Sequence, residues 1–192
     1  MTEAMKVVLK AEQRIEAMDR RRALTDAQRA EYSKEICKKL LTIPEVKNAK
    51  CILSYAATYD EVSMEYLAEL KKDARISYPI SYAKGIMKAY VPNSEKDWVI
   101  GKYDIKSPDE NHSSLMSPEE IDIVIVPCVG FDDTCKRLGH GAGYYDRYLP
   151  LCNKAKFICV AFEAQKLEDI VVNQYDIPMD AIVSEAAIYW PE

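Results

Sequence analysis

Apolar residues recur along the chain at two spacings, one typical of helices and one of strands. Between residues 3 and 22 they fall at near-helical intervals among charges, which predicts an amphipathic helix. Thr25 opens a second helix, because Thr25 and Gln28 form a capping box. The apolar face of this second helix comprises Ala30, Ile36, Cys37, Leu40 and Leu41, and Pro44 lies beyond its end.

Continuous apolar runs predict the strands. The run 121–127 is the strongest, and its lack of polar alternation is typical of a parallel sheet buried on both faces. Other strands are predicted at 51–56, 157–162 and 181–184, and a hairpin at 75–80 and 85–91. Helices are predicted near 63–72 and 141–151, with a short helical turn at 117–120.

Strands that alternate with helices predict an α/β fold, with a doubly wound, mostly parallel sheet and helices on both faces. No Pro/Gly/Ser-rich linker divides the 192 residues, so we expect a single domain over 1–192. Residues 92–117 are rich in polar side chains, and we expect a loop that covers another part of the molecule. Ligands of such sheets bind at the carboxyl ends of strands, here the loops after Tyr55 and Pro127.

Composition narrows the class of protein. The net charge of −5 argues against a nucleic-acid-binding protein, whose binding surface would be basic. Six cysteines without a C-x-x-C pair are predicted to be reduced core residues, and two histidines are too few for a multi-histidine metal cluster. No apolar run reaches the roughly 18 residues of a membrane span. We therefore expect a cytoplasmic monomer that binds neither nucleic acid nor membrane.

The segment between Val126 and Arg147 carries the densest chemistry. Four of the six glycines fall between Gly130 and Gly143, among the cations Lys136, Arg137 and Arg147. Glycine lets the backbone approach an anion closely, and the N–H groups of a loop that opens into a helix point at the anion. The alternative is a surface loop whose glycines only form turns. The clustering of four glycines within this one segment favours a phosphate site instead.

The glycine spacing fits neither common nucleotide fingerprint. Gly139, Gly141 and Gly143 run G-x-G-x-G where a Rossmann loop needs G-x-G-x-x-G, and Ala142 stands where a Walker loop has lysine. The pattern therefore indicates phosphate without naming a reaction. A second group of cations in the first helix could converge on the same phosphate, namely Lys6, Lys10 and Arg14.

The string RLGHGAGYYDR, preceded by Pro127, closely resembles the signature of the 5-formyltetrahydrofolate cyclo-ligases, also called 5,10-methenyltetrahydrofolate synthetases. Residues 6–25 look like the opening helix of that family, 60–62 like its acidic turn and 176–180 like its C-terminal segment. The resemblance implies conversion of 5-formyltetrahydrofolate to 5,10-methenyltetrahydrofolate with ATP and Mg²⁺, releasing ADP and phosphate. The γ-phosphoryl group passes to the formyl oxygen, N10 then attacks the activated carbon, and phosphate leaves.

The resemblance also implies roles for residues. Arg137 and Lys10 are the catalytic candidates, and the nucleotide-binding set comprises Lys6, Lys10, Arg14, Arg137, Leu138, Gly139, His140, Gly141, Ala142, Gly143, Tyr144 and Tyr145. Glu61 would accept hydrogen bonds from the pterin N–H groups, and the other folate candidates are Tyr55, Ala57 and Tyr144. The magnesium ligands would be Asp146 and Asp180.

The sequence departs from the family pattern at four of the quoted positions. Arg is usual at Lys10, Gly or Asn at Cys135, Gly or Lys at Ala142, and His at Tyr175. Lys10 keeps the charge but not the planar fork of arginine. Two other classes of function stay open, a sugar-phosphate enzyme with a similar sheet and a catalytically silent protein that binds nucleotide or folate.

Some of these residues also have ordinary structural explanations. Glu61 would be favoured by the dipole of the helix that follows it. Tyr55 and Tyr144 are of a type that more often packs in a core, and His140 could simply face solvent. A structure can separate these explanations from the functional ones.

Overall fold

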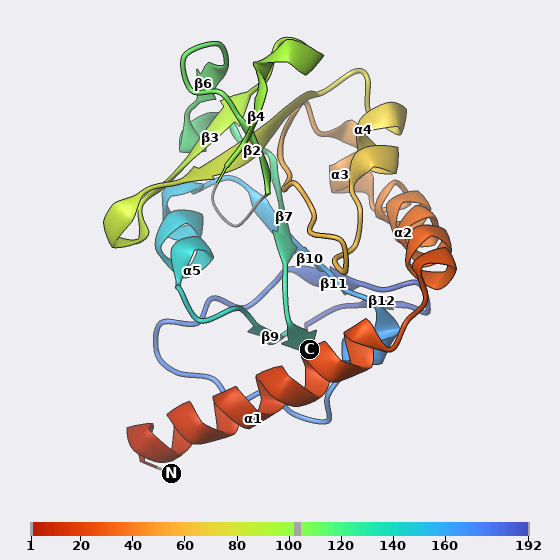
Figure 1. Cartoon of the computed structure of the whole chain (residues 1–192), viewed down its shortest axis with the longest axis vertical. Helices are drawn as coiled ribbons and strands as arrows, with labels where there is room; N and C mark the ends of the chain where they lie inside the picture. The colour runs from red at the N-terminus through yellow and green to blue at the C-terminus, as the bar shows by residue number, and fades with distance from the viewer. Residues whose placement is uncertain (1, 102–104, 192) are drawn as a thin grey trace.

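The computed structural model describes residues 2–101 and 105–191, and its centre is one eight-stranded sheet in the order β12-β11-β10-β7-β1-β2-β3-β6 (Figure 1). Neighbouring strands run parallel from β11 to β2, through β11 (Ala181–Val183), β10 (Lys156–Val160), β7 (Ile123–Pro127), β1 (Cys51–Leu53) and β2 (Arg75–Ser81). The edges are antiparallel, formed by β3 (Met87–Val91), β6 (Ser114–Met116) and β12 (Ile188–Tyr189). The predicted mostly parallel α/β sheet is confirmed.

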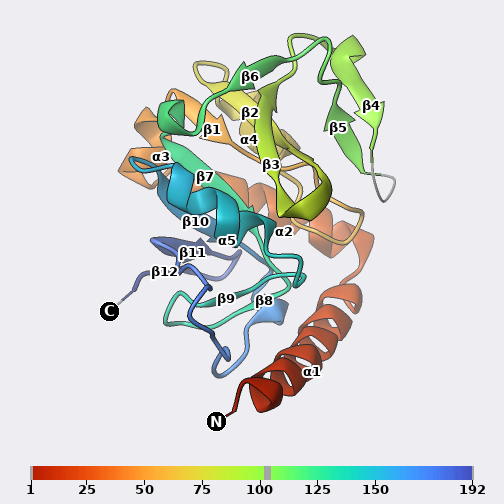
Figure 2. The same ribbon diagram turned by 90° about the vertical axis from the view of Figure 1, so that its left-hand side faces the viewer.

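Both faces of the sheet are buried, as the apolar run of β7 predicts. Ile123 and Ile125 pack on the face covered by α2 (Asp26–Leu40), α3 (Pro44–Asn48) and α4 (Glu65–Leu70). Val124 and Val126 pack on the other face, with Tyr148 of α5 (Tyr144–Tyr148). Figure 2 shows α5 in front of β7 on that face. Each fully buried branched side chain contributes about 1.5–3 kcal/mol, so β7 anchors both layers.

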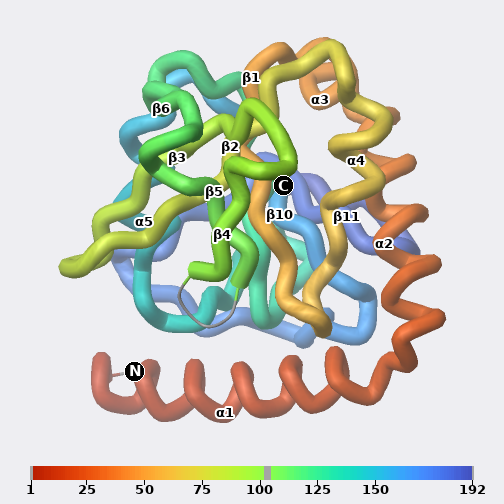
Figure 3. The backbone as a smooth tube through the Cα atoms, turned by 45° about the horizontal axis from the view of Figure 1, so that its top comes forward, coloured from red at the N-terminus to blue at the C-terminus, as the bar shows by residue number. Residues whose placement is uncertain are grey.

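The two N-terminal helices form where the sequence predicts them. Helix α1 (Glu3–Arg22) runs along one side of the molecule, and its N-terminus is the end remote from α2 (Figure 3). Helix α2 begins after Thr25, whose hydroxyl accepts from the Gln28 N–H at 3.2 Å while the Gln28 side chain accepts from the Thr25 N–H at 2.9 Å. The capping box is therefore confirmed.

Other element boundaries differ from the sequence predictions. Pro44 does not merely follow a helix but begins α3, where a missing N–H and a fixed φ are tolerated. The helix expected from residue 141 starts only at Tyr144, because Gly141 and Gly143 have φ of +96° and +67°. A 3₁₀ turn, η5 (Leu149–Leu151), completes it. Strand β1 ends at Leu53, three residues early.

The expectation of a plain loop over 92–117 is wrong. This segment contains η2 (Glu95–Asp97) and β6, and β4 (Trp98–Ile100) pairs with β5 (Lys106–Pro108) in a small separate sheet. Residues 102–104 lie outside the described residues. The Trp98 ring packs edge-on to Tyr78 of β2 with centroids 4.7 Å apart, which fixes the small sheet against the large one. The remaining short elements are η1 (Ala83–Gly85), η4 (Pro118–Glu120), β8 (Gly130–Phe131), β9 (Arg137–Leu138) and η6 (Glu163–Gln165).

All six cysteines are free thiols, and all but the half-buried Cys51 are buried, as predicted. In the described ranges, no helix has both the length and the apolar character to cross a bilayer.

Candidate active site

A cavity of about 1760 Å³ opens at the carboxyl ends of β1 and β7, where the doubly wound sheet predicts a ligand. Its walls come from α1, the loop after β1, the glycine loop 139–143, the β2–β3 turn, β5 and the segment 173–177. A pocket for one small molecule typically measures about 300–1000 Å³. The cavity therefore has room for two ligands side by side.

The glycine loop presents free backbone donors to this cavity. Gly141 and Gly143 adopt left-handed φ, which side chains tolerate poorly. A Cβ on Gly143 would lie 3.0 Å from Nη1 of Arg147, the flexible end of a long side chain, so the left-handed φ is what favours glycine there. Within the described part of the chain, the N–H groups of 140–143 donate to no acceptor. They are available for a bound anion.

Three of the predicted cations line the cavity together. Arg137 is almost completely buried, and its guanidinium donates to Asp146 Oδ1 at 2.7 Å and to the Ile177 carbonyl at 3.1 Å. Lys10 forms an ion pair with Asp176. The Nε of Arg14 donates to the Gly139 carbonyl at 2.9 Å. Two helix cations and one strand cation thus meet around the glycine loop.

One member of the predicted nucleotide set lies outside the cavity, and another is almost fully buried at its wall. Lys6 stands one turn nearer the N-terminus of α1 than Lys10, pairs with Glu3 at 3.0 Å and does not line the cavity. Leu138 lines the cavity, although the residue is only 1% exposed and its side chain packs in a small core cluster with Ala17. The remaining members, His140, Ala142, Tyr144 and Tyr145 and the three glycines, all line the cavity.

Glu61 is held on the opposite wall by the turn after β1. One carboxylate oxygen accepts from the Thr58 N–H at 3.0 Å, and the other lies 3.3 Å from Nε2 of His140. Burial raises the pKa of Glu61, but hydrogen bonds from His140 and Thr58 and the nearby charge of Arg21 outweigh it, so the pKa lies below its usual range. Glu61 is therefore an ionised acceptor in the cavity, and His140 connects it to the glycine loop.

The tyrosines differ in what their hydroxyls do. Tyr55 donates to the Val62 carbonyl at 2.7 Å and Tyr144 to the Tyr82 carbonyl at 3.0 Å, so both rings are fixed walls of the cavity. The buried Tyr145 hydroxyl has no partner among the described residues. Burial raises the pKa of Tyr145, which keeps its hydroxyl a donor. Ala57 lines an adjoining hollow of about 670 Å³ rather than the main cavity.

The structure separates the two predicted magnesium ligands. Asp146 lines the cavity, but its Oδ1 accepts from Arg137. Asp180 accepts from the Phe157 N–H at 2.8 Å and pairs with Lys156 at 2.9 Å, at the amino end of β10 and thus at the opposite edge of the sheet. Asp146 and Asp180 therefore do not share one site in this structure, and Asp180 lies away from the cavity. Among residues 2–101 and 105–191, no three metal-ligating side chains cluster together.

Several contacts at the cavity have no local signal in the sequence. Asp176, the partner of Lys10, follows it by 166 residues. The Nε of Arg147 donates to the Gly85 carbonyl at 3.2 Å and its Nη2 to the Ala142 carbonyl at 2.5 Å, so Arg147 ties the β2–β3 turn to the glycine loop. Gly85 has a φ of +73°, which favours glycine in that turn, and an added Cβ would also meet the Arg147 guanidinium at 1.9 Å.

A prediction about acid stability follows from the turn that carries Glu61. Burial raises the pKa of Asp60, but the charge of Arg21, 2.9 Å away, and a bond from Thr58 outweigh it and lower the pKa. The stabilisation is complete above the unfolded value of about 3.9 and is lost as pH falls through the lower folded value. We expect the free energy of unfolding, measured with urea, to fall as pH drops below about 4. Asp60→Asn should be less stable at pH 7 and show a shallower acid dependence; an unchanged slope would contradict this.

The fold and the cavity together define an α/β protein with a cation-lined glycine loop at one wall of a large cavity. A profile of the 5-formyltetrahydrofolate cyclo-ligase family matches residues 6–185, and the chain belongs to this family.

Named relatives and solved structures agree with that assignment. The 5-formyltetrahydrofolate cyclo-ligase of Escherichia coli K12 is 28% identical over 178 residues, covering 88% of this chain and 97% of the relative. The mouse cyclo-ligase is 28% identical over 185 residues, covering 90% and 91%. The structure of Aquifex aeolicus 5,10-methenyltetrahydrofolate synthetase superimposes with a TM-score of 0.83 at 30% identity, covering 95% and 92% of the two chains. The Mycoplasma pneumoniae synthetase, at 23% identity, shares the fold with a TM-score of 0.73, covering 92% and 98%.

Proposed function

We propose that this protein converts 5-formyltetrahydrofolate and ATP to 5,10-methenyltetrahydrofolate, ADP and phosphate. One observation carries the proposal: a single cavity has free N–H donors and buried cations on one wall and the ionised Glu61 on the other. The first wall suits a triphosphate. The second suits the N–H donors of a pterin ring, which need acceptors.

The chemistry of this reaction asks little covalent work of the protein. A formyl oxygen is a poor nucleophile and a poor leaving group until it accepts the γ-phosphoryl group, after which N10 closes the ring and phosphate departs. Phosphoryl transfer depends on in-line positioning and on neutralising charge that develops on the oxygens. Arg137, fixed by Asp146 and the Ile177 carbonyl, is a rigid cation for that purpose. Lys10, held by Asp176, is the second.

The two substrates divide the cavity between them in this proposal. ATP takes the side of Lys10, Arg14, Arg137 and loop 139–143, and folate takes the side of Tyr55, Glu61 and Tyr144. The free Tyr145 hydroxyl lies near both Glu61 and Arg137, whose charges act on it, and would donate where the substrates meet.

Magnesium fits this site only as a complex with ATP. Asp146 is the one predicted metal ligand at the cavity, and Mg²⁺ commonly combines one or two carboxylates with substrate phosphates. We therefore expect a chelator to abolish turnover and excess Mg²⁺ to restore it, with unchanged circular dichroism. Calorimetry with Mg²⁺ alone should detect no tight binding. Full turnover in chelator, or tight Mg²⁺ binding without ATP, would contradict the assignment.

The absorbance of methenyltetrahydrofolate gives the direct test of the proposed reaction. We expect it to appear only when protein, ATP, Mg²⁺ and 5-formyltetrahydrofolate are all present. Calorimetry with each substrate alone then separates the other classes of function. No binding of the folate would overturn the proposal and favour a sugar-phosphate enzyme, and binding of both ligands without product would indicate a silent binding protein.

A further inference from the structure

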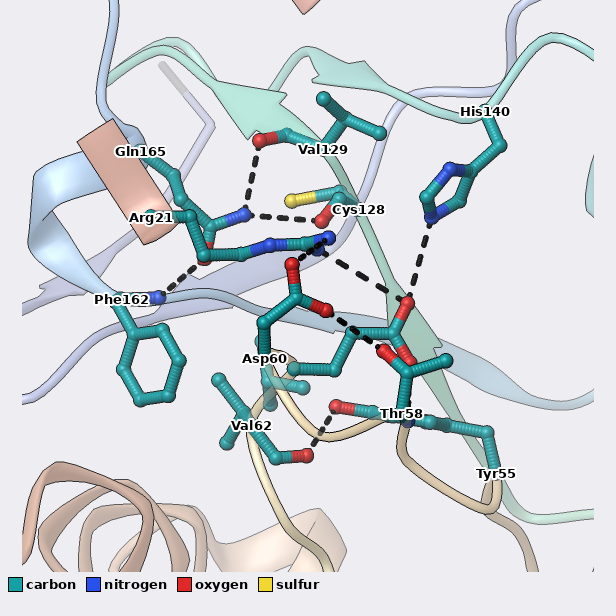
Figure 4. A network of polar contacts seen from close by, with 12 residues as sticks. Arg21, Tyr55, Thr58, Asp60, Val62, Cys128, Val129, His140, Phe162 and Gln165 are labelled. Atoms are coloured by element: carbon teal, nitrogen blue, oxygen red, sulfur yellow. Dashed lines mark hydrogen bonds and ion pairs between the residues drawn. The ribbon is translucent and has the colours of Figure 1, made fainter. Parts of the chain in front are cut away.

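A buried ion pair lies directly behind Glu61. Arg21, in the last turn of α1, donates through Nη2 to Asp60 Oδ2 at 2.9 Å, and the two side chains are only 3% and 6% exposed. Figure 4 shows the Arg21 guanidinium turned toward Asp60, with Thr58 beyond it. The second terminal nitrogen, Nη1, lies 4.0 Å from Glu61 Oε1. Arg21 therefore faces two adjacent carboxylates.

The turn that carries Glu61 closes on itself, and Arg21 joins it to α1. Thr58 Oγ1 donates to Asp60 Oδ1 at 2.9 Å, and the Glu61 N–H donates to the Thr58 carbonyl at 3.2 Å. The turn is thus a small rigid unit. Because Arg21 holds Asp60, it sets where the whole unit, including the Glu61 carboxylate, lies relative to the cavity.

Burial of Arg21 is energetically unfavourable, which a contact that serves only the fold would not require. Its Nε and Nη1 are buried and have no hydrogen-bond partner among the described residues. A buried donor without a hydrogen-bond partner lowers stability, and a buried charge is usually paired with an opposite charge. Arg22, next along the helix, approaches the same Asp60 oxygen at 3.9 Å yet stays half exposed, so attraction to Asp60 alone does not require burial.

We propose that Arg21 is a positioning residue, which holds Glu61 in place and keeps its charge for the folate. This inference rests on the proposed function and names a further residue for it. Arg21 does not touch the substrates in this scheme but acts through Asp60 and Glu61. Helix α1 then serves both substrates, with Lys10 and Arg14 on the nucleotide side and Arg21 on the folate side.

The test measures each ligand separately in Arg21→Gln, Arg21→Lys and the control Arg22→Gln. We expect Arg21→Gln to weaken 5-formyltetrahydrofolate binding about 10- to 100-fold and ATP binding less than about 2-fold. Arg21→Lys should recover part of the loss, because the charge remains while the fork is lost. Arg22→Gln should bind both ligands like the parent protein.

A double variant shows whether Arg21 acts through Glu61. Arg21→Gln combined with Glu61→Gln should bind folate no more weakly than Glu61→Gln alone, because residues that act through one another are not additive. Folate affinity should fall as acidic pH protonates Glu61. In Arg21→Gln this fall should begin about one pH unit higher, since the Glu61 carboxylate has lost a nearby cation. The other titratable groups that face Glu61 are His140, Tyr55, Tyr145 and the adjacent Asp60, and none of these side chains is changed in Arg21→Gln, so the shift reports the lost cation.

The outcomes are distinguishable from failure of the proposed function. If the parent protein does not bind 5-formyltetrahydrofolate, the proposed function fails first. If the parent binds it and Arg21→Gln binds equally well, or the double variant shows full additivity, the positioning role is overturned. Loss of folding in both Arg21→Gln and Arg21→Lys would also overturn it, because Arg21 would then be a residue of the fold.

Discussion

Arg137→Ala is expected to lower turnover by about 100-fold or more while the protein stays folded. The guanidinium is fixed at the cavity by two acceptors, Asp146 Oδ1 and the Ile177 carbonyl, before any substrate arrives. A cation that needs no rearrangement acts mainly on charge that develops in the transition state. The loss should therefore fall on kcat rather than on folate KM. Steady-state kinetics by methenyltetrahydrofolate absorbance measures both.

The neighbouring residue supplies the matched control for Arg137. Lys136 pairs with Asp169 at 2.8 Å on the surface and does not line the cavity, so Lys136→Ala removes the adjacent charge without touching the site. We expect its kcat within about 2-fold of the parent, since a solvent-exposed pair contributes little. If Arg137→Ala instead lowers the melting temperature enough to account for the lost rate, Arg137 is structural.

The sequence predicts most of the fold because its strongest signals are local. The capping box at Thr25 and the unbroken apolar run of β7 each depend on residues within one element, and both are present as expected. The departure at Cys135 is also local: its φ is +63°, which explains why the family usually has Gly or Asn there. Element ends are set by tertiary packing, as Pro44 shows by starting a helix instead of following one.

Much of the candidate site could also be predicted from the sequence, since the glycine loop and Glu61 lie where a doubly wound sheet binds its ligands. The contacts that organise these residues are not local. Arg14 reaches Gly139 across 125 residues, and Arg21 reaches Asp60 across 39. Asp180 is grouped with Asp146 by sequence, but it lies just before β11, at the amino ends of β10 and β11 and away from the cavity. Sequence order alone does not reveal this position.

Glu61→Gln is expected to weaken 5-formyltetrahydrofolate binding by about 1–3 kcal/mol and to leave ATP binding nearly unchanged. The substitution keeps the size of the side chain but turns one acceptor into a donor, which would face pterin N–H groups that themselves donate. The Thr58 N–H already takes one carboxylate oxygen at 3.0 Å, so the amide nitrogen would replace the other oxygen, which lies 3.3 Å from Nε2 of His140. Separate titrations of the two ligands measure the effect.

An exposed acid provides the control for this last substitution. Glu65, in the first turn of α4, does not line the cavity, and Glu65→Gln makes the same chemical change without reaching a ligand. Its folate and ATP affinities should equal those of the parent. Because Asp60 still pairs with Arg21 when Glu61 is replaced, the turn should keep its place and the protein its stability. Equal weakening of both ligands, or of ATP alone, would mean that Glu61 supports the nucleotide or the fold, and its assignment to folate would fail.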